Sequence, residues 1–330
     1  MMTDIMESLE RLREFSKEFS ELYVGKEEEI DMILISAISG EPLLFVGEPG
    51  TAKSDMIVKF AKLLPYSKNN PQSVYDVEGG YFEYMLTRFT EPSEIIGPID
   101  ILKLKNDGVF ERNVKGKLPT AEIVFLDEIF KANSAILNVL LTIINEKKYY
   151  QGGKPQPVKL KILYAATNKV SVDEELKALK DRFTLKVKTS QVQDNYFKEL
   201  IVKGLLNEGR DIKPVDYFTF EDLLKIREFF EKKFKKPEED MELFLSQETL
   251  SLLRKIISTI KNELKIFISD RKIIKIYKLL RVYSTIKQDK KDGSIGLKSM
   301  AILKYIGEED EDFDRLENNV NDIIMRIVSV

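Results

Sequence analysis

The chain has 330 residues, of which 43% are apolar and 32% are charged, and its formal net charge is −3. This composition is typical of a soluble globular protein with room for two domains, and it argues against a disordered chain or a generally basic nucleic-acid-binding protein. The sequence has no cysteine and no histidine, which excludes disulfides, thiol chemistry, a histidine base and histidine-bound zinc. We expect a cytoplasmic protein without a signal peptide or a membrane span.

Apolar residues recur at three and four positions from Ile5 to Leu22, which predicts a first helix, and a second helix is expected from Ile30 to the break at Gly40. A short apolar strand, a glycine-rich turn and a helix beginning at Lys53 follow. Five strands are predicted in all, at residues 43–46, 81–86, 123–126, 162–167 and 184–187. A short helix is expected to start at Pro92-Ser93, and another helix is expected over residues 133–146.

Two hairpins are predicted between these elements. The first covers residues 99–114 with a turn at Asp107-Gly108, and the second covers residues 147–161 with Gly152-Gly153 at its tip. After about residue 190 only helical periods remain, apart from a polar loop at 289–294. We therefore predict an α/β domain over residues 1–190 and a helical domain over 191–330.

A phosphate-binding pattern follows the first strand. Residues 47–54 read G-E-P-G-T-A-K-S, one residue away from the G-x-x-x-x-G-K-[ST] loop. Backbone N–H groups in such a loop surround phosphate oxygens, the lysine reaches the β- and γ-phosphates, and the serine hydroxyl binds Mg²⁺. The alternative is an ordinary glycine turn, and the departure is an alanine in place of the third glycine, which we expect the loop to tolerate. The predicted nucleotide-binding residues here are Gly47, Glu48, Pro49, Gly50, Thr51, Ala52, Lys53 and Ser54.

Two more polar groups end buried strands. Asp127 and Glu128 follow residues 123–126, and Asn168 follows residues 162–167. Open α/β sheets bind ligands at the carboxyl ends of their strands, so Asp127 is predicted to hold Mg²⁺ with Ser54, and Glu128 to polarise the attacking water. Asn168 would orient that water. The alternatives are a strand-end cap for the acidic pair and a turn residue for Asn168.

Five segments together resemble the MoxR family of AAA+ ATPases, and its RavA branch in particular: residues 47–54, L-T-R-F-T-E-P-S-E-I-I-G-P at 86–98, residues 123–147, A-A-T-N at 165–168 and L-K-D-R-F at 179–183. The resemblance implies an AAA+ core of five mainly parallel strands with helices on both faces, a helix-2 insert, a pre-sensor-1 hairpin and an all-α lid.

The resemblance also implies roles for single residues. Asn168 would be sensor 1, Arg182 would be the arginine finger that reaches the neighbouring subunit's nucleotide, and Arg271 would be sensor 2, acting on its own or a neighbour's γ-phosphate. The alternatives are a salt bridge of Arg182 with Asp181 and an exposed arginine at a helix start. Tyr23, Val24 and Gly25 would border the adenine, or would merely stop a helix.

For the whole protein the resemblance implies Mg²⁺-dependent hydrolysis of ATP to ADP in a homo-oligomeric ring, expected to be a hexamer, that remodels protein partners together with a von Willebrand factor A domain protein. The alternative is a nucleic-acid motor, which the mixed charge of the two hairpins disfavours. A scaffold gated by nucleotide is a third possibility, against which the intact Asp127-Glu128 pair argues.

Overall fold

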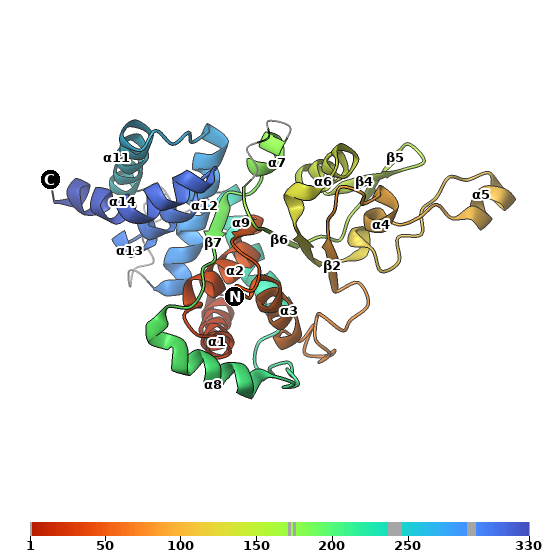
Figure 1. Ribbon diagram of the computed structural model, residues 1–330, viewed down its shortest axis with the longest axis horizontal. Coiled ribbons are helices and arrows are strands. Elements are labelled where there is room, and N and C mark those ends of the chain that lie inside the picture. Colours follow the sequence, from red (N-terminus) through yellow and green to blue (C-terminus); the bar gives the residue numbers. More distant parts are fainter. Residues whose placement is uncertain (1, 171–172, 174–175, 237–245, 289–294, 330) are drawn as a thin grey trace.

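The structure is a computed structural model that describes residues 2–170, 173, 176–236, 246–288 and 295–329 (Figure 1). The polar loop predicted at residues 289–294 lies outside the described residues. In the part of the chain that is described, no helix combines the length and the apolar character needed to cross a membrane.

A parallel sheet forms the centre of the α/β part, as the sequence predicts. Its five strands are β1 (Leu43–Val46), β2 (Tyr81–Met85), β3 (Ile123–Asp127), β6 (Ile162–Thr167) and β7 (Leu185–Lys188). They lie in the order β2-β3-β6-β1-β7, and every neighbouring pair is parallel. The carboxyl ends of all five strands therefore lie at one end of the sheet, here called the carboxyl edge. Their amino ends lie at the opposite end, here called the amino edge.

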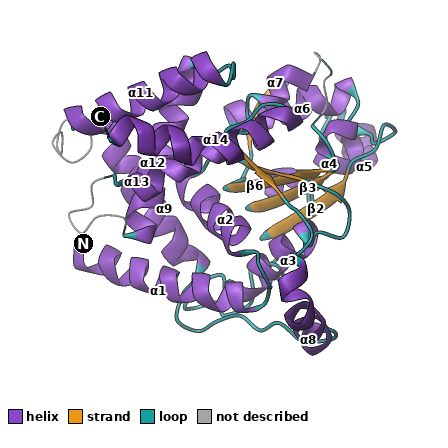
Figure 2. Cartoon of the chain, turned by 60° about the vertical axis from the view of Figure 1, so that its left-hand side comes forward, coloured by secondary structure: helices purple, strands orange, loops and turns teal. Residues whose placement is uncertain are grey.

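Helices cover both faces of this sheet (Figure 2). Because side chains of a strand alternate between its faces, Leu43 and Phe45 enter one hydrophobic core while Leu44 and Val46 enter another. The first core includes α1 (Met2–Glu21), α2 (Glu27–Ser39) and α3 (Lys53–Leu63), and the second includes α4 (Pro92–Ile96), α6 (Ser134–Glu146) and α7 (Lys177–Lys180). Burial on both faces explains why β1 is apolar along its whole length.

The chain after β7 is helical, as predicted. The helices described there are α8 (Phe197–Asn207), α9 (Phe220–Lys235), α11 (Gln247–Glu263), α12 (Asp270–Lys287), α13 (Leu297–Met300) and α14 (Asp310–Val328), with the short 3-10 helices η4 (Asp194–Tyr196) and η6 (Ala301–Tyr305). Two further 3-10 helices, η1 (Leu118–Thr120) and η2 (Ile129–Lys131), lie earlier in the chain, on either side of β3. α9 packs against α1 and α2, and α12 packs against α2. These helices share one core with the sheet's first face. A domain boundary at residue 190 stays a prediction.

One of the two predicted hairpins is confirmed. The strands β4 (Lys148–Gln151) and β5 (Lys154–Pro157) pair antiparallel, and Gly152 and Gly153 adopt φ of 55° and 76° at the turn. Such positive φ values are accessible to glycine without strain, which is why the Gly-Gly pair predicts this turn correctly.

The hairpin predicted at residues 99–114 is wrong at its tip. The bridge between Ile99 and Arg112 is antiparallel, but the chain between them forms the helix α5 (Ile101–Asp107) at the end of the molecule opposite the C-terminal helices (Figure 1). The side chain of Asp100 accepts from the N–H groups of Leu102 and Lys103, and Gly108 ends the helix with φ of 65°. These are helix-capping contacts, so the Asp-Gly pair ends a helix here and does not turn a hairpin.

Candidate nucleotide site

The loop between β1 and α3 approaches the end of β7 very closely. A Cβ atom on Gly47 would lie 2.2 Å from the carbonyl oxygen of Thr189, so no other residue fits at Gly47 without moving the chain after β7. The hydroxyl of Thr51 lies 2.8 Å from that of Thr189. Thr189 was not predicted from the sequence, although its place shortly after the fifth predicted strand was an available signal.

Ala52 explains why the phosphate-loop pattern carries a third glycine. Ala52 precedes α3 and adopts the left-handed conformation with φ of 64°. The sequence suggests that alanine is a harmless substitute, whereas this backbone costs a non-glycine residue on the order of 1 kcal/mol. The loop forms despite that strain, and Met56 N donates to Ala52 O across the first turn of α3.

Lys53 lies inside the loop that precedes it. Its Nζ donates to the carbonyl oxygens of Gly47 and Glu48 at 2.6 and 2.7 Å. Burial lowers the pKa of Lys53, while the nearby carboxylates of Asp127 and Glu128 act in the opposite direction. The structure thus brings the loop lysine and the acidic pair of β3 into one electrostatic cluster, as the sequence predicts for parallel strands.

Glu128 is held by three groups around the end of β3. Its Oε1 accepts from Asn168 Nδ2 at 2.6 Å and pairs with Lys131 Nζ at 3.1 Å, and its N–H donates to Asp127 Oδ1. Glu128 itself adopts φ of 53°, a strained backbone of the kind found at functional sites. Asn168 and Glu128, predicted separately on two strands, are therefore in direct contact.

The donor set at this edge fits a magnesium ion held with phosphates. Ser54 lies in the first turn of α3 and is exposed, and Asp127 ends β3. Hydroxyl and carboxylate oxygens are hard ligands, and Mg²⁺ typically takes only one or two protein ligands beside phosphate oxygens and water. Ser54 and Asp127 would hold the ion, which would screen the phosphate charge.

A cavity of about 800 Å³ adjoins the loop and is large enough for a nucleoside. Tyr23 and Val24, for which contact with the adenine stays a prediction, line it together with Pro49 to Ala52. Tyr23 is fixed there, because its hydroxyl donates to Asp55 Oδ2 at 2.7 Å and because burial, reinforced by Asp55, raises its pKa.

One side of this cavity was not predicted. Residues of α8, which the sequence shows only as a helical period, line it together with the loop. Lys203 Nζ donates to Tyr23 O and Asn207 Nδ2 to Leu22 O, so α8 is attached to the segment before α2. No local signal in α8 indicates this packing.

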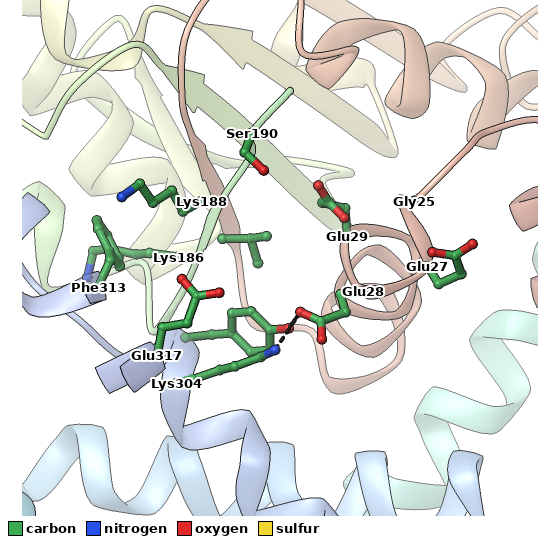
Figure 3. A pocket seen from close by; sticks show the side chains of 12 residues that line it. Gly25, Glu27, Glu28, Glu29, Lys186, Lys188, Ser190, Lys304, Phe313 and Glu317 are labelled. Atoms are coloured by element: carbon green, nitrogen blue, oxygen red, sulfur yellow. Dashed lines mark hydrogen bonds and ion pairs between the residues drawn. The ribbon is translucent and has the colours of Figure 1, made fainter. Parts of the chain in front are cut away.

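Gly25 lies against a different, smaller cavity of about 160 Å³, between α2, β7 and the C-terminal helices. Figure 3 shows it, with Lys304 bonded to Glu28. That volume is too small for a nucleotide. The structure therefore places Tyr23 and Val24, but not Gly25, at the large cavity.

Arg182 and Arg271 lie away from the acidic pair, at the amino edge. They line a common cavity with residues that directly precede β1 and β6. Arg182 NH1 and Arg271 NH1 lie 3.0 and 3.8 Å from the same atom, Asp181 Oδ2. The salt bridge considered for Arg182 is thus present, and Arg271 shares it. The four to six residues of β1 and β6 separate this cavity from the carboxyl edge by roughly 13–20 Å, at about 3.3 Å per residue.

Residues 10–228 match the family model described as the MoxR domain in MoxR-vWA-beta-propeller ternary systems. An uncharacterized protein of Methanocaldococcus jannaschii is 34% identical over 94% of this chain and 73% of its own length. The chaperone MoxR1 of Mycobacterium tuberculosis is 23% identical over 56% of this chain and 46% of its own length. The structure of a proposed ATPase from Cytophaga hutchinsonii superimposes with a TM-score of 0.71 at 17% identity, over 99% of this chain and 96% of the other, and it shares the fold.

Proposed function

Because the chain belongs to the MoxR family of AAA+ ATPases, we propose that it hydrolyses ATP at the interface between neighbouring copies of itself. Lys53 binds the β- and γ-phosphates, and Ser54 and Asp127 hold Mg²⁺. Glu128 polarises the attacking water, and Asn168, bonded to Glu128, positions that carboxylate.

The observation that carries this proposal is the separation of the two arginines from their own phosphate loop. Arg182 and Arg271 meet at Asp181 on the amino edge, while an arginine side chain extends only about 7 Å from its Cα. A span of roughly 13–20 Å lies between that edge and the loop. Both arginines therefore act on a neighbour's γ-phosphate, where a guanidinium stabilises the charge of the transferring phosphoryl group.

The assembly is a homo-oligomeric ring, for which a hexamer is the expected form, and it remodels protein partners in the cytoplasm. The name of the matching family model supports a von Willebrand factor A domain protein as the partner. A RavA-like branch stays a prediction.

A titration of protein concentration tests the proposal. Specific ATPase activity should rise with concentration as interfaces form, and Glu128→Gln should abolish it at every concentration while nucleotide binding persists. A specific activity that is constant over a hundredfold dilution through the assembly range would contradict hydrolysis between subunits.

A further inference from the structure

The cavity that contains Arg182 and Arg271 holds more positive charge than those two arginines supply. Its volume is about 500 Å³, and it is bordered by the end of α6, the residues before β1 and β6, and the start of α12. Five basic side chains and one carboxylate line it: Lys147, Lys161, Arg182, Arg271, Lys275 and Glu41.

Only part of this charge is balanced by residues that the structure describes. Lys275 Nζ pairs with Glu41 Oε2 at 2.8 Å, and the two arginines share Asp181. The Nε atom of Arg182 is buried without a hydrogen-bond partner among the described residues. A polar cavity with a surplus of cations and a buried, unpaired donor is suited to an anion with several oxygens.

Lys147 is a basic residue of this cavity whose ammonium group is not held by a partner among the described residues. In the described part of the chain that group has no hydrogen bond or ion pair, and the residue is exposed at the cavity. Desolvation by the surrounding protein, and then the charge of Arg227, lower the pKa of Lys147 to about 8, while the carboxylate of Glu41 acts in the opposite direction. Lys161 lies near a different carboxyl, that of Glu122: burial raises the pKa of Glu122, and the charge of Lys161 acts to lower it.

The backbone of Lys147 is fixed on both sides. Its N–H donates to Ile143 O at the end of α6, and its C=O accepts from Val158 N at the base of the hairpin. The residue adopts φ of 53° as the C-cap of α6. α6 has thirteen residues, about 20 Å at 1.5 Å per residue, and it begins shortly after Glu128. One helix therefore runs from the carboxylates of one edge to Lys147 near the other.

We propose that Lys147 is a third cationic contact, beside Arg182 and Arg271, to the outermost phosphate of the nucleotide held by a neighbouring copy of this chain. The inference rests on the proposed function and adds a residue to it. Lys147 binds the phosphate as a point charge with three donors, whereas the arginines bind it through planar guanidinium groups.

The test measures ATP-dependent self-association and does not depend on turnover. All variants carry Glu128→Gln, so that ATP persists, and sedimentation velocity gives the protein concentration of half-assembly with ATP and with ADP. Lys147→Met should raise that concentration about tenfold with ATP, equivalent to about 1.4 kcal/mol, and leave it unchanged with ADP. Lys147→Arg, which keeps the charge, should restore it.

Lys148→Met is the matched control, since Lys148 adjoins Lys147 but its Nζ pairs with Glu146. An equal effect of Lys147→Met with ATP and ADP, or none with ATP, overturns the inference. Arg182→Ala distinguishes a failure of the inference about Lys147 from a failure of the proposed function. If it weakens ATP-dependent assembly while Lys147→Met does not, only the inference fails; if ATP promotes no assembly even with Arg182 and Lys147 intact, the proposed function fails too.

Discussion

The two edges of the sheet differ in how their charges are balanced. At the carboxyl edge, two loop carbonyls accept hydrogen bonds from Lys53, and Glu128 contacts Asn168 and Lys131. At the amino edge, the described basic side chains outnumber the described carboxylates that approach them. The difference indicates that the carboxyl edge is organised by contacts within the chain, whereas the amino edge is suited to receive negative charge from outside it.

The largest effect on the rate of hydrolysis should come from substituting one residue at each edge in turn. Arg182→Ala should reduce the rate of hydrolysis by about 10³-fold or more, while the affinity of dilute protein for a fluorescent ATP analogue stays unchanged. Lys53→Ala should instead lower that affinity at least about tenfold, because it removes a charged phosphate contact.

Arg182→Lys provides the control for charge alone, and it should remain impaired because a lysine lacks the planar pair of donors. If Arg182→Ala lowered nucleotide affinity in dilute protein as much as Lys53→Ala does, the two edges would belong to one site within one chain.

The smallest expected effect lies within the phosphate loop. Ala52→Gly should relieve the left-handed strain and raise the apparent free energy of unfolding by about 0.5–1 kcal/mol, a shift of roughly 1–2 °C in Tm. Gly50 adopts φ of 82°, which strains any residue with a Cβ even though the space around it is open, so Gly50→Ala should shift Tm in the opposite direction. Thermal melts of the two variants check both signs, and a lower Tm for Ala52→Gly would contradict the assignment of strain.

Much of the sheet and its carboxyl edge could be predicted from the sequence, because local patterns determine them. Apolar runs such as residues 123–126 and 162–167 fix buried strands, and polar residues at their ends must then meet at one edge. The contact between Asn168 and Glu128 follows from that geometry. The failure at residues 99–114 has a local cause as well, since Asp100 caps a helix through contacts that a turn-based interpretation overlooks.

The remaining features depend on contacts between segments far apart in the chain. The attachment of α8 to Leu22 and Tyr23 has no signature in either segment. The meeting of Arg271 with Arg182 requires α12 to pack beside the amino edge, which no periodicity specifies. For the same reason, the sequence left open whether Arg271 acts within its own chain.

Mixing two inactive variants tests most directly whether the two edges are halves of one site. Glu128→Gln inactivates the carboxyl edge, and Arg182→Ala inactivates the amino edge. Each protein alone should therefore hydrolyse ATP at a small fraction of the unmodified rate. In an equimolar mixture, random pairing joins two intact edges at about one interface in four, and activity should recover to roughly a quarter. A mixture no more active than the mean of its two components would contradict the account.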